Sequence, residues 1–328
     1  MDHEYRLFLV KIYLSLKIII AINLRNRKGS VNLMKCWIIY NTFLKSDKFI
    51  DYAQMIQEAA QYMGHEAIIY KNSDILNLIT SPPESLKEKP DYVVFTDKDI
   101  YLAQYLEAQG ILVYNSSQTI ETSDDKIKTY QQLAHAGVPV PETIIIPKTY
   151  GNFVHLEDEF FDSAIQQLGM PLIVKEAFGS FGEQVYLANN LSELKELVFH
   201  HSDQPLMLQQ FISTSYGRDV RIQVVGNQVI AAMERRAQND FRANVTTGAQ
   251  MLAYNPSADE INIAVKASQA IGAQFSGVDL LFGPNDTPIV CEVNANAHIR
   301  NLLLATGVNA AYEMIRHIEG ILKGKKHL

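Results

Sequence analysis

Apolar and polar residues alternate along residues 34–118 in the order expected of a small parallel α/β unit. Short apolar runs have the length and composition of buried strands: "KCWIIY", "EAIIY", "DYVVFT" and "ILVY". After the first run, apolar residues recur at helical spacing from Phe49 to Met63. Ser46 is the predicted cap of this helix and Gly64 its predicted stop, and "IYLAQYLEAQG" predicts a second helix. The alternation predicts a parallel sheet covered by helices.

The rest of the chain is predicted to hold two further groups of strands. A Ser/Thr-rich junction, "NSSQTIETSDD", leads into a helix that ends at Gly137, because the prolines of "VPVPE" cannot continue it. A strand, a helix over 155–168, two strands around a glycine loop and another helix follow. One hairpin then turns at Gly226-Asn227, and a second spans 275–296.

Three shorter signals complete the predicted order of elements. "PLMLQQFI" reads as a connecting strand, Ser257 and Glu260 form a capping box at the start of a helix, and "AAYEMIRHIEGIL" is a last amphipathic helix. The predicted domains are an extension over 1–33, a parallel α/β domain over 34–118, a central subdomain over 119–206 and a C-terminal subdomain over 207–328.

The first residues, 1–33, do not follow this pattern. Their apolar run, "LFLVKIYLSLKIIIAI", is interrupted by Lys11 and Lys17, so it is short and charged for a membrane span. A signal peptide would need a small-residue cleavage site, and none follows the run. A peripheral amphipathic helix and an extension that is not native to the protein are the other interpretations. We expect folding to begin at Met34, where a clean strand pattern opens.

Composition and charge narrow the possible functions. The 328-residue chain is 47% hydrophobic and 20% charged, as globular domains with an ample core are. Its formal net charge is −7 and it has no basic tract, so nucleic acid is not expected as a partner. Cys36 and Cys291 lie far apart in apolar runs, which predicts reduced core residues in a cytoplasmic protein.

Lys175 ends an apolar strand directly before a loop that contains Gly179 and Gly182, within "PLIVKEAFGSFGEQVYL". A lysine at a strand end often reaches water, and this is one interpretation. A lysine beside a glycine-rich hairpin loop can instead neutralise phosphate, while loop amides donate hydrogen bonds and glycine lets the backbone come close. The loop alone does not decide between the two, and an acidic hairpin downstream favours phosphate.

That hairpin, "FSGVDLLFGPNDTPIVCEVNAN", places two acidic residues opposite each other. If Gly283 pairs with Pro288 across the turn, Asp279 lies opposite Glu292 on the same face of the sheet. Asn294, two residues further on, shares this face. Opposed carboxylates in apolar surroundings repel each other and lose solvation, and a divalent cation would relieve both penalties. The pattern favours a Mg²⁺ or Mn²⁺ site, and a solvent-facing acidic pair in another register is the alternative.

Seven segments follow one another in a recognisable order: "DK", "PLIVKEAFGSFG", "LQQFI", "GRDVRIQVVGNQVIAAMERRA", "DFRANVTTGA", "GVDLL" and "CEVNAN". In this order they resemble the ATP-grasp superfamily, and most closely the RimK-type ligases that add glutamate to a carboxylate. The likeness runs from about Met34 to Gly324 and is dense between residues 119 and 318. It implies an ATP-grasp fold, α/β in class, preceded by a small parallel α/β domain.

The resemblance implies a role for each matching position. Lys175 would hold the phosphates of ATP with help from Lys126 of "DK". The loop that folds over ATP would consist of Gly179, Ser180, Phe181 and Gly182. The other nucleotide-binding positions would be Gln210, where the family usually has an acidic residue, Phe211, Asp219, Arg242, Ala243 and Asn244. The metal ligands would be Asp279, Glu292 and Asn294, and the catalytic arginines that face phosphate or substrate carboxylate would be Arg221, Arg235 and Arg242.

The implied activity is that of an ATP-dependent carboxylate–amine ligase that uses ATP and Mg²⁺ or Mn²⁺. Its substrates would be a glutamate-like amino acid and a carboxylate acceptor, and it could form a homo-oligomer. An idle nucleotide-binding module, and an enzyme that makes another bond, such as a dipeptide ligase, are the alternatives. A carboxylase would normally carry partner domains that this chain does not show.

The sequence departs from the RimK pattern after the metal positions. Where the family usually has Pro-Gly, this chain has Ala297-His298. The loss of Pro-Gly reshapes the turn and is expected to bring His298 and Arg300 close to the acceptor site. A ribosomal protein tail, a glutamate-bearing coenzyme, an amino-carrier protein and a small peptide all remain open as acceptors.

Overall fold

The computed structural model describes residues 33–75, 88–148, 157–180, 182–243 and 248–325. One compact unit begins at Lys35, and the predicted extension over residues 1–33 lies outside the described part of the chain except for its last residue, Leu33. Among the described helices, none has the length and apolar character needed to cross a membrane.

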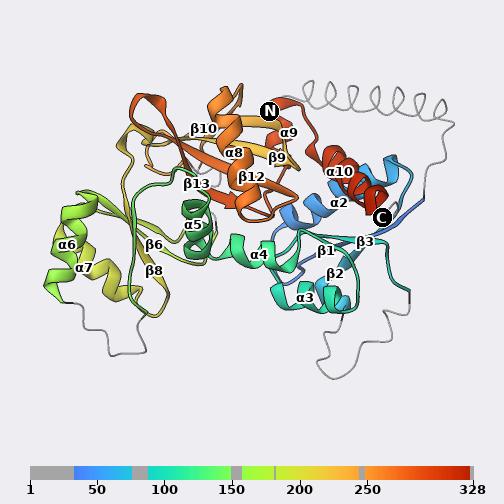
Figure 1. The fold of residues 1–328 in the computed structure, drawn as a ribbon, viewed down its shortest axis with the longest axis horizontal. Coiled ribbons are helices and arrows are strands. Elements are labelled where there is room, and N and C mark those ends of the chain that lie inside the picture. Colours follow the sequence, from blue (N-terminus) through green and yellow to red (C-terminus); the bar gives the residue numbers. More distant parts are fainter. Residues whose placement is uncertain (1–32, 76–87, 149–156, 181, 244–247, 326–328) are drawn as a thin grey trace. The chain divides into compact units, whose positions relative to one another are not determined.

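The N-terminal sheet is parallel, as the sequence predicts, with the strand order β2-β1-β3-β4 (Figure 1). Its strands are β1 Lys35–Tyr40, β2 Glu66–Lys71, β3 Tyr92–Phe95 and β4 Val113–Tyr114. Trp37, Ile39, Val93 and Phe95 pack against the helix α3 (Ile100–Ala108), while α2 (Asp47–Tyr62) contacts β1 and β2. The predicted cap is confirmed, because the side chain of Ser46 accepts a hydrogen bond from the backbone N–H of Lys48.

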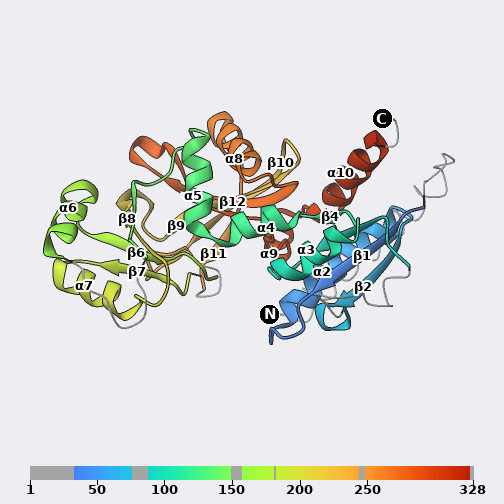
Figure 2. The same ribbon diagram turned by 60° about the horizontal axis from the view of Figure 1, so that its bottom comes forward.

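Two helices connect this sheet to the rest of the molecule: α4 (Ser117–Asp124) and α5 (Lys126–His135). Figure 2 shows α4 between the N-terminal sheet and α5. The second sheet is antiparallel, with the order β5-β8-β6-β7. Its elements are β5 Thr143–Ile145, α6 Asp158–Leu168, β6 Leu172–Glu176, β7 Val185–Ala188, α7 Leu191–His200 and β8 Leu206–Gln210. Leu172 and Val174 of β6 share one core with α6 and α7, so the alternate residue Lys175 points to the other face.

The third sheet is antiparallel, with the order β11-β10-β9-β12-β13. Its elements are β9 Arg218–Val225, β10 Gln228–Arg236, β11 Gln250–Tyr254, α8 Ala258–Ala270, β12 Phe275–Phe282 and β13 Pro288–Asn294, followed by α9 Arg300–Thr306 and α10 Ala310–Lys325. The predicted turn at Gly226 is confirmed, and this residue has a φ of 56° that glycine adopts freely. The predicted capping box of Ser257 and Glu260 opens α8.

The hairpin of β12 and β13 confirms the predicted pair but corrects the predicted turn. Pro288 pairs with Phe282, not with Gly283, so the turn is one residue away from the expected register. A bulge then shifts the register between Asp279 and Leu280, and Cys291 is the extra residue on β13. Because of this bulge, Asp279 still lies opposite Glu292.

Candidate functional site

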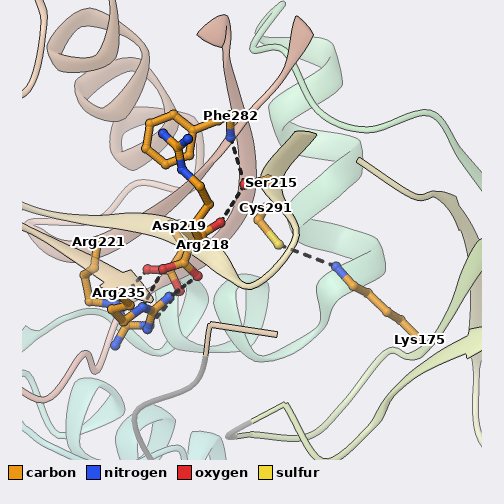
Figure 3. A network of polar contacts seen from close by, with 9 residues as sticks. Lys175, Ser215, Arg218, Asp219, Arg221, Arg235, Phe282 and Cys291 are labelled. Carbon is orange, nitrogen blue, oxygen red and sulfur yellow. Dashed lines mark hydrogen bonds and ion pairs between the residues drawn. The ribbon is translucent and has the colours of Figure 1, made fainter. Parts of the chain in front are cut away.

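Lys175 lies in the interior, between the second and third sheets. Only 6% of the residue is exposed, and its Nζ lies 3.7 Å from Sγ of Cys291 (Figure 3). The same Nζ lies 5.7 Å from the ring centroid of Tyr130. Burial alone would lower the pKa of Lys175, but the neighbouring Cys291, Tyr130 and Glu292 outweigh burial and raise it. This lysine does not reach water from a strand end, so the interpretation as a solvated side chain is wrong.

Cationic side chains hold the backbone of the glycine loop from both ends. Nζ of Lys126, the first residue of α5, donates to the carbonyl oxygen of Gly179 at 3.1 Å. At the other end, Nη1 of Arg242 donates to the carbonyl oxygen of Gly182 at 2.7 Å. Gly179 has a φ of 132°, and an added Cβ would lie 2.2 Å from the Gln184 side chain, so glycine is required here. Phe181 of this loop lies outside the described residues.

Lys126 is buried in a positively charged environment. Burial lowers its pKa, and repulsion from Lys98 and Lys175 lowers it further, while Glu292 and Asp124 act in the opposite direction. The structure thus brings the two lysines that the sequence predicts, Lys126 and Lys175, into one group of charges with Glu292. A site of this kind favours a ligand with several negative oxygens.

A buried chain of alternating charges crosses the third sheet (Figure 3). Nε and Nη2 of Arg235 each donate to Asp219 at 2.6 Å, and Nη2 also donates to Asp279 at 2.9 Å. Arg221 donates to the same Asp279 through Nε at 2.7 Å and Nη2 at 2.6 Å. Burial would raise the pKa of Asp279, but the two arginines outweigh burial and lower it.

This network corrects the electrostatic reason for the predicted metal site. The charge of Asp279 is balanced by Arg221 and Arg235, so no cation is needed to relieve repulsion between Asp279 and Glu292. Arg235 is 7% exposed, and its donors to the two aspartates leave it no open fork for a substrate. Within the described part of the chain, Nη1 makes no hydrogen bond in either arginine. The side chain of Arg221 is 18% exposed and that of Arg235 is 9% exposed, so Arg221 is the more accessible of the two to a substrate.

The predicted metal ligands still fit a divalent cation. Glu292 makes no ion pair with any described residue. The buried Asn294 atom that lacks a partner among them is Nδ2, a donor, so this side chain would bind a cation through Oδ1. Oδ1 of Asp279 accepts one hydrogen bond from the described residues, so a lone pair remains. Among the described residues, no group of three His, Cys, Asp or Glu side chains is arranged to hold a metal ion, so the fit depends on two carboxylates and one amide.

The predicted adenine-binding positions follow the end of β8. Gln210 is exposed, and its backbone N–H donates to the carbonyl oxygen of Glu142 at 2.9 Å. The half-buried ring of Phe211 lies 6.3 Å from Tyr216 and 6.1 Å from Phe241, measured between centroids. Of the remaining predicted positions, Ala243 is 6% exposed, Arg242 also pairs with Asp240, and Asn244 lies outside the described residues.

The turn that replaces Pro-Gly packs against the start of α2. The ring of His298 lies 5.5 Å from Phe49 and 5.3 Å from Tyr52, between centroids. Burial, together with Lys48 and Arg221, lowers the pKa of His298 to about 4, so the ring is neutral at physiological pH. Nε of Arg300 donates to Asp51 at 3.0 Å, which ties the same turn to α2.

Sequence reasoning missed one cation near the glycine loop. Nζ of Lys98, in the segment between β3 and α3, donates to Oγ of Ser180 at 3.2 Å and to Asp124 at 2.6 Å. The position of Lys98 shortly after a parallel strand could have indicated a binding residue, because ligands of such sheets bind at the carboxyl ends of the strands. Its distance of 82 residues from Ser180 along the chain hid this contact.

Comparison with known proteins gives consistent matches. Residues 123–318 match the family described as the RimK-like ATP-grasp domain. An uncharacterized protein of Mycoplasma pneumoniae is 30% identical over 284 residues, which cover 85% of this chain and 98% of that protein. A probable alpha-L-glutamate ligase of Haemophilus influenzae is 32% identical over 289 residues, with 81% and 92% covered.

The solved structures support the fold. The crystal structure of a RimK domain ATP-grasp protein from Sphaerobacter thermophilus has a TM-score of 0.65 and 21% sequence identity, covering 86% of this chain and 98% of that one. The predicted fold, a parallel α/β sheet followed by the two antiparallel sheets of an ATP-grasp unit, is confirmed.

Proposed function

Because the chain belongs to the family of RimK-like ATP-grasp domains, we propose that it is an ATP-dependent ligase that joins a carboxylate to an amine as an amide. The added amine is glutamate or a similar amino acid. One observation carries the proposal: Lys126 and Arg242 donate to carbonyl oxygens of the glycine loop, while Lys126 and Lys175 both lie near Glu292 of the acidic hairpin. This arrangement suits a polyphosphate whose terminal phosphoryl group is transferred.

The nucleotide would lie between the second and third sheets. Its phosphates would accept hydrogen bonds from Lys126 and Lys175, whose charges burial leaves poorly solvated. Arg242, which in this structure donates to loop carbonyls, would add a third donor. The base would lie against the segment of Gln210 and Phe211. The amide of Gln210 can donate and accept hydrogen bonds but brings no charge to the base.

ATP is required because a carboxylate is a poor electrophile. Attack of a carboxylate oxygen on the γ-phosphorus breaks the bond to ADP and gives an acyl phosphate. The amine nitrogen then attacks the acyl carbon, the C–O bond to phosphate breaks, and the nitrogen loses a proton as the amide forms. ATP-grasp ligases bind ATP together with Mg²⁺, and a magnesium ion held by Glu292, Asn294 and Asp279 would neutralise charge on the phosphates.

The side chains of this protein position the reactants and stabilise charge. Lys126 and Lys175 would oppose the charge that develops on the transferred group, in a site with little water. Arg221 would present Nη1 to a substrate carboxylate while Asp279 fixes the plane of its guanidinium group. Arg235 would support Arg221 indirectly, because it holds Asp219 and Asp279 in place.

Three features support an amino acid such as glutamate as substrate. The H. influenzae relative is named a probable alpha-L-glutamate ligase. Nη1 of Arg221 makes no hydrogen bond to a described residue and can donate to a carboxylate, and the neutral ring of His298 beside it can accept a hydrogen bond from an amine. The acceptor would bind on the same side, at the turn of residues 297–300, where this chain differs from the RimK pattern.

Phosphate release from ATP, measured against a panel of carboxylates and amino acids, tests the proposal. Mass spectrometry of the reaction mixture then identifies the product. We expect release that requires both a carboxylate and an amine, and a product heavier than the acceptor by one amino acid less water. Binding of ATP without turnover on any pair would favour an idle nucleotide-binding module. A product from two identical amino acids would favour a dipeptide ligase.

A further inference from the structure

Lys98 occupies a fixed position at the carboxyl end of the N-terminal sheet. On one side, the backbone N–H of Thr96 donates to the carbonyl oxygen of Ile39 at 2.9 Å. On the other side, Asp99 caps α3 by accepting a hydrogen bond from the N–H of Leu102. The lysine side chain therefore leaves the sheet from an ordered backbone, at the edge where parallel sheets bind their ligands.

The ammonium group of Lys98 meets the glycine loop beside the ammonium group of Lys126. Lys98 donates to Oγ of Ser180 at 3.2 Å, and Lys126 donates to the carbonyl oxygen of the preceding residue, Gly179, at 3.1 Å. Lys98 also donates to Asp124, two residues before Lys126 in the chain, at 2.6 Å. Two cations from different elements thus converge on adjacent residues of one loop.

In the group formed by Lys126 and the charged side chains that act on it most, lysines outnumber carboxylates. Lys98 and Lys175 both lower the pKa of Lys126, and the opposing carboxylates are Glu292 and Asp124. Three ammonium groups therefore face two carboxylates. A ligand that brings several negative oxygens would relieve the repulsion between the lysines, and a polyphosphate is such a ligand.

A simple surface ion pair between Lys98 and Asp124 is the competing explanation. Lys128 of α5 and Glu121 of α4, the helix that also holds Asp124, provide a comparison: they also lie 2.6 Å apart, but neither contacts the glycine loop within the described residues. The Lys128 side chain is 46% exposed and that of Lys98 is 42% exposed, so exposure does not separate the two. The two lysines differ in that Lys98 donates a hydrogen bond to Ser180 of the glycine loop.

We propose that Lys98 is a third lysine of the polyphosphate site, contributed by the N-terminal sheet, and that its ammonium group binds phosphate oxygens of the nucleotide. Asp124, which accepts a hydrogen bond from this ammonium group, competes with the phosphates for it. The proposal rests on the proposed ATP-dependent function and adds to it a residue that the motifs in the sequence did not mark.

The test is the dissociation constant of Mg²⁺-ATP for the full chain, measured by calorimetry without any second substrate. Replacing Lys98 by Met removes a charge-assisted hydrogen bond and should weaken binding about tenfold. Lys98→Arg keeps the charge and should bind within about threefold of wild type. Lys128→Met is the matched control and should bind as wild type does. Thermal unfolding of each variant confirms that it is folded.

Asp124→Asn distinguishes phosphate binding from a structural ion pair. If Lys98 binds phosphate, this variant frees its ammonium group and should bind Mg²⁺-ATP as tightly as wild type or more tightly. Equal weakening in Asp124→Asn and Lys98→Met would overturn the proposal, and so would wild-type affinity in Lys98→Met. If wild type itself does not bind Mg²⁺-ATP, the proposed function fails and this inference with it. If Lys175→Met weakens binding but Lys98→Met does not, only this inference fails.

Discussion

Replacing Arg235 by Met tests whether this arginine supports the third sheet or faces a substrate. Its side chain is 9% exposed and makes hydrogen bonds to Asp219 and Asp279. Methionine has a similar length but no charge and no donor. In the variant, Asp279 keeps the two hydrogen bonds from Arg221, while Asp219 loses its cation.

The expected cost follows from the buried charge that is left behind. Breaking a buried ion pair by removing one partner costs about 3–5 kcal/mol. Burial already raises the pKa of Asp219, so this carboxyl can take up a proton once Arg235 is gone. Protonation limits the penalty, and we expect a loss near the lower end, about 3 kcal/mol of unfolding free energy at pH 7.5.

The same reasoning gives the pH dependence. Without Arg235, the folded variant would bind a proton at Asp219 that the unfolded chain does not bind above about pH 4. Stability of the variant therefore falls as pH rises, and its deficit relative to wild type should be smaller at pH 5.5 than at pH 7.5. Arg235→Lys keeps the charge but loses the fork, so its loss should be about half as large.

Urea unfolding followed by far-ultraviolet circular dichroism measures these differences, with equal m values as the condition for comparing midpoints. Arg236→Met is the control, because Arg236 is next on the same strand and its side chain is 56% exposed. We expect this control to lose at most about 1 kcal/mol. If Arg235→Met unfolds at the wild-type midpoint and changes only the Michaelis constant of the amino acid or acceptor, Arg235 faces a substrate and the structural role is wrong.

Three further predictions concern the site. Lys175→Met should weaken binding of Mg²⁺-ATP at least tenfold, since it removes a charge-assisted contact of about 1.5–3 kcal/mol, and an unchanged dissociation constant would exclude this lysine from the phosphate site. Glu292→Gln should lower turnover about 100-fold or more while leaving metal-free unfolding within about 0.5 kcal/mol of wild type, and turnover near wild type would contradict the metal assignment. His298 has a folded pKa of about 4, below the value near 6.5 of an unfolded chain, so its neutral form stabilises the fold above pH 6.5 and this contribution is lost as pH falls from 6.5 toward 4. Unfolding of His298→Gln should lack this part of the pH dependence, and equal profiles for both proteins would show that the ring is not buried as described.

The sequence determined the elements and most of their order. Apolar spacing located α2, Ser46 and Ser257 marked where helices begin, and the glycine at 226 marked a hairpin turn. These are local signals, in which neighbouring residues decide the backbone conformation. Periodicity also located Lys175 at the end of a strand and the two acidic residues on a hairpin, and the resemblance to the RimK pattern indicated Lys126, at the start of α5.

Tertiary structure decided how charges far apart in the chain are balanced. The predicted turn was off by one residue, and Asp279 still pairs with Glu292 only because β13 has a bulge at Cys291. Such a bulge cannot be predicted from the alternation of apolar and polar residues. Arg235 is predicted to face phosphate or a substrate carboxylate, and packing of β9, β10 and β12 side by side gives its Nε and Nη2 to two buried aspartates. Periodicity shows which face of a strand a residue occupies. It does not show which charged side chain of another strand lies next to that residue. This neighbouring charge decides whether an arginine is available to bind a ligand.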